Sequence, residues 1–366
     1  YSALDSLSFI FDAGISGQIT NYSESGVQVN AKNANFEYVI AGFRLAKRLG
    51  LSFGLLPFSN IGYSYSNTKA LNSTDGSTSV VKATNTYSGT GGLHQVYLGL
   101  GWSPFKGFAI GVNAAYLWGD YSRSVVNSYT DAYANTLSKY YTAEVHNYKL
   151  DFGMQYTQKI TKNDAITLGV TYGLGHKLSS DPKCQIISTN AQTAVADTAT
   201  YSIGNGLELP HSYGVGIMWN HANRWRVGAD YTLQKWSSVA YPKFDTSTNS
   251  YELVSGQFAD RHKMTVGGEF CPDERSRNFF KRVHYRMGAS YATDYLKIKG
   301  QNGPKEYSVS AGFGIPIVNG YSNSTMLKIS AKWVRPEEQD FVRSNSLRIN
   351  IGLTFNERWF AKWKME

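Results

Sequence analysis

Apolar and polar residues alternate along most of this 366-residue chain, in segments of about ten residues. The clearest segment, 148–156, places Tyr, Leu, Phe, Met and Tyr on one face and Lys, Asp, Gly and Gln on the other. Segments 166–174, 225–233 and 347–355 repeat this pattern. A period of two residues predicts β-strands with one apolar and one polar face.

This alternation predicts fourteen strands, most of them much longer than the five or six residues that are usual in soluble sheets. We expect them at 7–24, 32–47, 50–67, 84–102, 107–121, 140–159, 164–178, 207–219, 224–237, 257–271, 282–297, 305–315, 324–334 and 344–357. A soluble β-sandwich also alternates, but its strands are shorter. The sequence therefore favours an all-β fold, a 14-stranded antiparallel transmembrane β-barrel.

The predicted connections alternate in length. Long connections at 25–31, 68–83, 122–139, 179–206 and 238–256 are separated by short turns. Long extracellular loops and short periplasmic turns are typical of bacterial outer-membrane barrels. The alternation predicts that both termini lie in the periplasm, and no linker divides residues 1–366 into more than one barrel domain.

Composition supports a membrane location without membrane helices. Hydrophobic residues make up 42% of the chain, yet the mean hydropathy is −0.34, because polar residues interrupt every apolar stretch. A membrane helix needs about 20 consecutive apolar residues, so the membrane must be crossed by strands. Aromatic residues at strand ends predict two interfacial girdles that contact outer-membrane lipid and lipopolysaccharide. They are Trp102, Tyr116, Trp118, Trp219, Trp225, Trp236, Trp333 and Trp359.

The formal charge of +9 does not indicate nucleic-acid binding, because the basic residues are scattered and not clustered. We expect cations along the lumen and at the rim, facing acidic headgroups. The chain has no G-x-S-x-G, H-E-x-x-H or P-loop motif. Its seven histidines, at 94, 146, 176, 211, 221, 262 and 284, lack metal-ligand spacing. No enzymatic activity, cofactor or metal is expected.

Ionisable residues occupy the polar register of several predicted strands. They are Lys149, Asp151, Arg226, Asp230, Lys263, Glu269, Arg286, Lys328 and Arg348, together with His284 and Lys332. This register faces the lumen of a barrel. The residues either line a pathway for a polar solute or pair with one another as a filling of the lumen, because charges removed from bulk water must be paired.

The two cysteines are predicted at opposite ends of the barrel. Cys184 falls in the longest outer loop, and Cys271 falls at the periplasmic end of a strand. The membrane would separate them, which excludes an intramolecular disulfide bond.

The third predicted strand is interrupted by the segment Leu56, Pro57, Phe58, Ser59 and Asn60. Proline cannot donate a ladder hydrogen bond, so it belongs at a bulge, an edge or a kink. Such a kink either opens a lateral window in the barrel wall or is a simple bulge that adjusts its curvature.

Three segments of the sequence, at 1–9, 56–59 and 355–360, resemble FadL/TodX-type outer-membrane proteins, most closely those of Bacteroidota. The resemblance implies a 14-stranded barrel and a kinked third strand that opens laterally to lipid. It also implies an N-terminal hatch with an Asn-Pro-Ala element ahead of the first strand. This sequence begins almost directly with that strand, so the hatch is expected to be absent from the chain.

The resemblance implies passive uptake of hydrophobic molecules of the long-chain fatty acid type, with lateral release near Pro57. A hydrophobic ligand or detergent is the expected occupant. The alternative is a non-transporting structural subunit of a multi-protein outer-membrane complex, because FadL-like barrels of Bacteroidota also serve in barrel-assembly and type IX secretion machinery. In that case protein partners dock on outer loops 179–206 and 238–256 or on the turn segment 273–277.

Overall fold

The computed structural model describes residues 9–24, 27–71, 81–298, 300–319, 324–336 and 343–357. These residues form an all-β structure with two short helical segments, η1 (Trp236–Ser238) and α1 (Phe279–Arg282). Among the described residues, no helix has the length and apolar character needed to cross a membrane.

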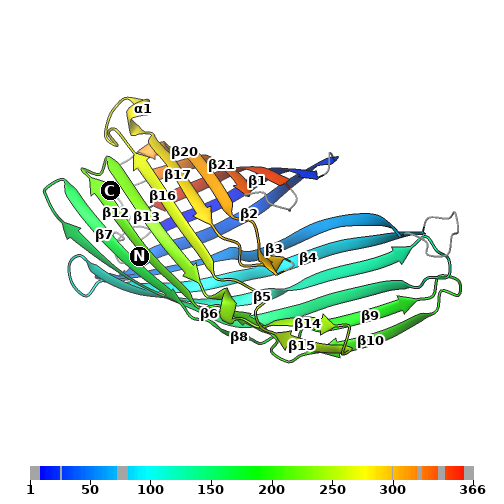
Figure 1. Cartoon of the computed structure of the whole chain (residues 1–366). Coiled ribbons are helices and arrows are strands. Elements are labelled where there is room, and N and C mark those ends of the chain that lie inside the picture. The colour runs from blue at the N-terminus through cyan, green and yellow to red at the C-terminus, as the bar shows by residue number, and fades with distance from the viewer. Residues whose placement is uncertain are drawn as a thin grey trace, which may run out of the picture.

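Fourteen strands of the described chain form a closed antiparallel barrel, as predicted (Figure 1). They are β1 (Phe9–Glu24), β2 (Val27–Ala46), β3 (Leu49–Leu71), β4 (Val81–Trp102), β5 (Phe108–Tyr129), β6 (Thr136–Lys159), β7 (Asp164–Gly173), β12 (Ser212–His221), β13 (Trp225–Gln234), β16 (Arg261–Phe270), β17 (His284–Ala292), β20 (Glu306–Asn319), β21 (Ser324–Pro336) and β22 (Arg343–Glu357). Each strand pairs with the next in this order, and β22 pairs with β1 to close the barrel. Closure satisfies the backbone of a membrane-spanning sheet.

The predicted alternation places apolar side chains on the outside of this barrel. Val266 and Val309 are each 55% exposed, and Leu347 is 44% exposed. Exposed apolar side chains in a continuous band around a barrel are the surface that lipid covers. The polar register of the same strands points toward the lumen.

The two ends of the barrel differ. One end, here called the turn end, carries the connections 47–48, 103–107, 160–163, 222–224 and 271–283. The first described residue of β1 pairs with the last described residue of β22 at this end. The opposite end, here called the loop end, carries the longer hairpins.

Several segments predicted as loops are strands at the loop end. β2 begins at Val27 and β5 continues to Tyr129, so the loops expected at 25–31 and 122–139 are much shorter than predicted. The expected loop 179–206 contains β9 (Lys183–Thr189) and β10 (Ala196–Ser202), and 238–256 contains β14 (Tyr241–Asp245) and β15 (Ser250–Val254). These stretches are rich in Ser, Thr, Asn and Tyr and stand beyond the apolar band, so they lack the alternation that predicts a membrane strand.

Two further pairs of short strands lie outside the barrel sheet. β8 (His176–Leu178) pairs with β11 (Leu207–Leu209), and β18 (Lys297–Ile298) pairs with β19 (Gln301–Asn302). β8 and β11 interrupt the long hairpin that runs from β7 through β9 and returns through β10 to β12.

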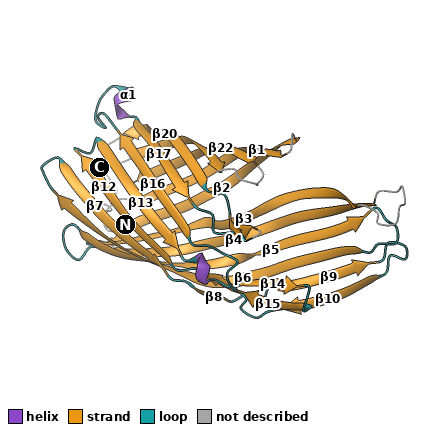
Figure 2. Ribbon diagram, in the orientation of Figure 1, coloured by secondary structure: helices purple, strands orange, loops and turns teal. Residues whose placement is uncertain are grey.

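At the loop end, one side of the barrel wall continues as a projecting sheet, here called the outer sheet. It consists of residues 59–71 of β3, 81–92 of β4, 119–129 of β5 and 136–145 of β6, followed by β9 and β10 (Figure 2). The pairing of β6 changes from β7 to β9 where this sheet leaves the barrel.

A line of irregular residues, here called the crease, marks that boundary. The β3–β4 register shifts between Pro57 and Ser59, and Gly91 and Gly119 have positive φ angles of 107° and 143°. A Cβ atom at Gly119 would lie 2.2 Å from the carbonyl oxygen of Gly92. Only glycine allows β4 and β5 to approach this closely at the bend.

A hydrophobic cluster stabilises the crease. Leu117 of β5 and Val145 of β6 are fully buried, and Leu178 of β8 and Leu209 of β11 pack against them. Leu93 and Leu207 complete the cluster. The six residues come from five strands, β4, β5, β6, β8 and β11, so the cluster connects the barrel wall to the outer sheet. Truncation of one such leucine to alanine typically costs about 2–5 kcal/mol.

The crease predicts that Gly119 tolerates no side chain. We expect Gly119→Ala to lower the free energy of unfolding by about 2–3 kcal/mol, because the added Cβ meets a backbone oxygen and alanine disfavours the φ angle. Urea unfolding in detergent, followed by tryptophan fluorescence, measures this loss. The matched control is Gly62→Ala, where a Cβ meets nothing within 4 Å. Equal stabilities for the two variants would contradict the steric account.

Candidate lateral opening and lumen

Strands β2 and β3 pair only near the turn end. Their register runs from Ala46 opposite Leu49 to Val39 opposite Leu55. Beyond that point, described residues of β2 remain paired with β1, and residues 56–71 of β3 remain paired with β4. Figure 1 shows the two strand pairs diverging toward the loop end. The wall is therefore split along part of its height.

Both strands carry a local irregularity where the pairing stops. In β2, Tyr38 lies opposite Gly14 and Phe36 lies opposite Ile15, so Glu37 is an extra, bulged residue. In β3, the bulge leaves out Phe58, directly after Pro57. A bulge bends its strand, and proline removes a hydrogen-bond donor from the ladder. The bulge at Glu37 therefore turns β2 away from β3, and Pro57 with the bulge at Phe58 turns β3 away from β2.

The predicted kink segment, 56–60, forms the margin of this split on β3. The Nδ2 atom of Asn60 donates to Oδ1 of Asn35 across the split, at 3.4 Å. The hydroxyl oxygen of Ser59 accepts from the backbone N–H of Leu93 at 3.1 Å, which holds the bulge against β4. Further toward the loop end, the strand edges present backbone groups without β2–β3 pairing. Such edges need water, lipid headgroups or another chain.

Most of the ionisable residues predicted for the lumen have a partner. Lys149 pairs with Asp151, and Lys328 pairs with Asp12 at 2.5 Å. The guanidinium Nε of Arg286 donates to Glu269 Oε2 at 2.6 Å. Arg226 Nη1 donates to the other oxygen of this carboxylate at 3.0 Å.

Arg348 donates to Oε1 of Gln18 at 2.7 Å and lies 3.7 Å from the carboxylate of Glu37. Lys332 lies 3.9 Å from Glu306. Within the described residues, Asp230 and Lys263 form no ion pair. Most of these ionisable side chains therefore have a partner within the described residues, and their role in a solute pathway or a lumen filling remains a prediction.

The sequence interpretation missed Asp12, Gln18 and Glu37, the partners supplied by β1 and β2. Tyr38 adds a hydrogen bond from its hydroxyl to Asp12 Oδ1 at 3.2 Å. Asp12 and Gln18 stand on the polar register of the first predicted strand, so the alternation could have identified them. Glu37 reaches the lumen only because of the bulge, which the alternation does not reveal.

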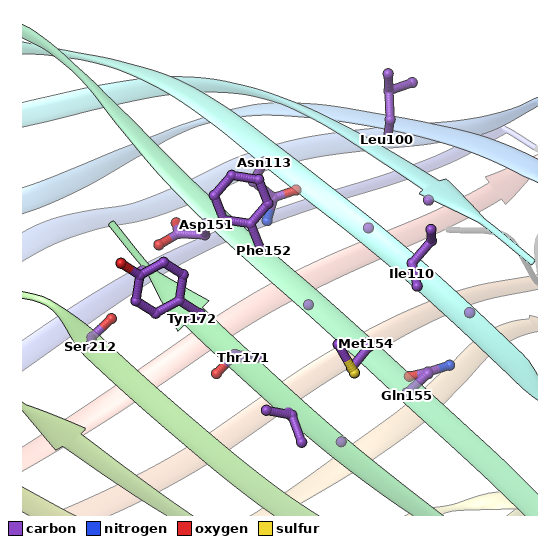
Figure 3. Close-up of a pocket in the computed structure, with 17 residues that line it drawn as sticks. Leu100, Ile110, Asn113, Asp151, Phe152, Met154, Gln155, Thr171, Tyr172 and Ser212 are labelled. Carbon is purple, nitrogen blue, oxygen red and sulfur yellow. The ribbon is translucent and has the colours of Figure 1, made fainter. Parts of the chain in front are cut away.

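A pocket of about 450 Å³ occupies the barrel wall at β4, β5, β6, β7 and β12 (Figure 3). Gly111 lies directly opposite Gly101 on one side and Gly153 on the other. These three residues have no side chains, so the backbone of β4, β5 and β6 is uncovered there on the lumen side. A second pocket of about 590 Å³ overlaps it, and Trp102, Ile110 and other apolar residues line it. These belong to the outward register, which suits a lipid acyl chain.

The β14–β15 hairpin packs against the outer sheet. The rings of Tyr251 and Tyr141 have centroids 6.4 Å apart, and those of Phe244 and Tyr201 are 5.2 Å apart. Asp260 stabilises the base of the connection that contains this hairpin. Its carboxylate pairs with Lys235 and accepts a hydrogen bond from the backbone N–H of Ser237 at 3.0 Å.

The Asp260 carboxylate is ionised under all ordinary conditions. Partial burial opposes its ionisation, but the hydrogen bonds from Lys235 and Ser237 prevail and hold its pKa at about 2. The tie at the base of the hairpin therefore persists at neutral pH.

The two cysteines occupy opposite ends of the barrel, as predicted. Cys184 is buried in β9 at the loop end, and Cys271 is buried directly after β16 at the turn end. Both are free thiols. Burial raises the pKa of Cys184, which keeps its thiol protonated and unreactive at neutral pH.

The shared carboxylate of Glu269 leads to a prediction about the lumen. We expect Glu269→Gln to destabilise the barrel by about 1–3 kcal/mol, because two arginines lose their common counter-ion and both are only partly exposed to water. Thermal unfolding in detergent measures the effect. Asp230→Asn, on the same register, serves as the control and should change stability little. A larger loss for Asp230→Asn would contradict the assigned pairing.

A family model described as BamG matches residues 1–366, the whole chain. No curated protein matches the sequence.

Solved structures with the same fold include hydrophobic-compound channels. A TodX mutant described as a monoaromatic hydrocarbon channel superposes with a TM-score of 0.63 and 13% identity, covering 98% of this chain and 92% of its own. The Pseudomonas putida toluene transporter TodX gives 0.60 and 15%, covering 96% and 89%. A Pseudomonas aeruginosa FadL homologue gives 0.58 and 12%, covering 98% and 91%. These neighbours are transport proteins and not enzymes, and at such identities they establish a FadL-like outer-membrane barrel fold.

Proposed function

The chain belongs to the BamG family, and from this premise we propose that it is a non-transporting structural subunit of a multi-protein outer-membrane complex of the barrel-assembly type. The family model described as BamG covers the whole chain, whereas the hydrocarbon channels share only its fold at 15% identity or less. In this proposal the turn end and both termini lie in the periplasm, the outer sheet stands outside the cell, and the source is a member of the Bacteroidota.

The split between β2 and β3 carries the proposal. From Val39 and Leu55 toward the loop end, the described backbone N–H and C=O groups on the facing edges of β2 and β3 do not pair with each other. Edges of this length are usually shortened, covered or charged, because they recruit other chains. A partner that adds a strand or lays a surface on this edge would supply the missing hydrogen bonds.

The lumen supports the same proposal. Its polar register carries paired charges, such as Glu269 with Arg226 and Arg286, and these disfavour passage of an apolar solute. At the crease, the fully buried Leu117 and Val145 form a packed cluster where the barrel meets the outer sheet. The β14–β15 hairpin adds a further packed layer at the loop end.

Passive uptake of hydrophobic molecules, of the long-chain fatty acid type, is the second candidate. The kink segment 56–60 borders the split, and the split begins part of the way up the barrel wall. The fold is similar to that of proteins described as hydrocarbon channels and toluene transporters. In this version, the ligand leaves the lumen sideways between β2 and β3.

Site-specific photo-crosslinking distinguishes the two candidates. A photoreactive amino acid replaces the exposed Ser64 of β3, and the matched control replaces the lipid-facing Val266 of β16. In the native membrane, we expect Ser64 to give one discrete protein adduct that migrates with a larger complex on blue-native electrophoresis. Val266 should give no protein adduct of that size.

A transport assay tests the second candidate, passive uptake of hydrophobic molecules. The pair Asn35→Cys and Asn60→Cys, bridged by a bifunctional maleimide, closes the split in purified protein in liposomes. We expect uptake of a fluorescent long-chain fatty acid to remain at the level of empty liposomes, whether or not the bridge is present. A monomer band, no adduct at Ser64, and uptake that the bridge abolishes would overturn the subunit proposal in favour of transport.

A further inference from the structure

The turn between β16 and β17 brings together side chains suited to a metal ion. Cys271, Glu274 and His284 each offer one ligand atom, and these atoms lie within 4.8 Å of one another. The turn occupies residues 271–283, at the opposite end of the barrel from the outer sheet, with α1 at its tip (Figure 1). None of these three residues takes part in the proposed docking edge.

The protein backbone positions two of the three ligands. Cys271 is the first residue after β16, and its N–H donates to the carbonyl of Arg224 at 2.9 Å. His284 is the first residue of β17. The turn is folded back on itself, because the N–H of Asp273 donates to the carbonyl of Lys281 at 2.9 Å and Asn278 caps α1.

The environment of the cluster is that of a buried coordination site. Cys271 is 2% exposed and His284 is 7% exposed, whereas Glu274 is exposed and can adjust. A thiol, an imidazole and a carboxylate are the donor set that zinc prefers. Zinc bonds of about 2.0–2.3 Å in a tetrahedron separate the ligand atoms by about 3.3–3.8 Å. The Nε2 atom of His284 lies 3.9 Å from Glu274 Oε1, so this pair needs only a small contraction, and all three ligand atoms lie within 4.8 Å of one another.

Glu269 lies next to the buried imidazole, where its carboxylate would orient the ring of a metal-bound His284. Its Oε1 lies 3.1 Å from His284 Nδ1, on the side of the ring away from Glu274. A carboxylate at Nδ1 favours the tautomer with hydrogen on that nitrogen, which leaves the Nε2 lone pair directed toward the metal. Arg286 and Arg226 hold this carboxylate at 2.6 Å and 3.0 Å. Glu269 offsets one of these two positive charges, and at the other side of the ring the thiolate of Cys271 and the carboxylate of Glu274 would offset the charge of the cation.

From this geometry we propose that Cys271, Glu274 and His284 bind one zinc ion, which fixes the turn between β16 and β17. The ion closes the loop from Cys271 to His284 and so restricts the unfolded turn. It also holds α1 in place, where Phe280 is 71% exposed.

Cobalt titration tests the site. The full-length chain, purified in detergent with a tag free of histidine, is reduced, stripped with a chelator and titrated with Co²⁺. We expect one equivalent to produce visible bands and a sulfur-to-cobalt charge-transfer band, both removed by Zn²⁺. Cys271→Ser should abolish the charge-transfer band, and Glu274→Gln, which alters an exposed side chain, should weaken zinc binding at least about tenfold. Cys184→Ser is the matched control and should bind like the parent chain.

Trypsin provides a structural measure, because Arg275, Arg277 and Lys281 lie in the turn. Zinc should slow cleavage of the turn about tenfold in the parent chain and in Cys184→Ser, but not in Cys271→Ser or Glu274→Gln. The proposal is overturned if the parent chain binds no cobalt at micromolar concentration. It is also overturned if Cys271→Ser or Glu274→Gln retains the parent spectrum and affinity. Resistance to SDS without heating verifies that each variant keeps its barrel.

Discussion

Backbone hydrogen bonding is the constraint on which the rest of this structure depends. A sheet in lipid must pair every N–H and C=O group internally, and closure of the barrel through β1 and β22 meets that demand on most of its circumference. Within the described residues, strands β2 and β3 depart from this pairing, since their register ends at Val39 and Leu55. The bulge at Glu37 and the proline at position 57 explain why the departure occurs there. In the proposed subunit role, a partner protein forms hydrogen bonds with the backbone groups on those edges.

Backbone pairing also constrains how the strands bend at the crease. Pro57, Gly91 and Gly119 allow three neighbouring strands to bend together while most of their ladder remains intact. The cluster around Leu117 and Val145 then packs at the bend. A single long strand such as β5 thus serves twice, first as barrel wall and then as part of the outer sheet. Because β3 lies at the free edge of that sheet, the bend also determines which way the edge is presented.

The sequence predicted the barrel well because lipid and lumen impose opposite polarities on successive residues. All fourteen strands are present, and Glu269 and Arg286 pair with each other on the register for which the sequence predicts lumen-facing residues. The predicted strand ends were wrong beyond the apolar band, where both faces of a strand are polar and alternation gives no signal. There β2 begins at Val27, β5 ends at Tyr129 and β6 begins at Thr136, within segments predicted as loops. Pro57 was recognisable as a breaker, but the extent of the split depends on β2 as well.

Sites made by distant residues were harder to predict. Sequence spacing gave no metal site, because Cys271 and His284 meet only when the turn between β16 and β17 folds back. Likewise, Asp12 reaches Lys328 because the first and last strands close the barrel. In both cases the strands were predicted, but their relative register was not, and register decides which side chains meet.

Residue-resolved hydrogen–deuterium exchange measures the central claim most directly. In the isolated chain in detergent, amides of residues 49–55 that point toward β2 should be protected. Alternate amides of residues 56–71, on the edge that faces the split, should exchange at close to the rate of unstructured backbone. In the native complex, the same edge amides should become protected. Protection of 56–71 equal to that of 49–55 in the isolated chain would show that β2 and β3 pair along their full length, and would contradict the account.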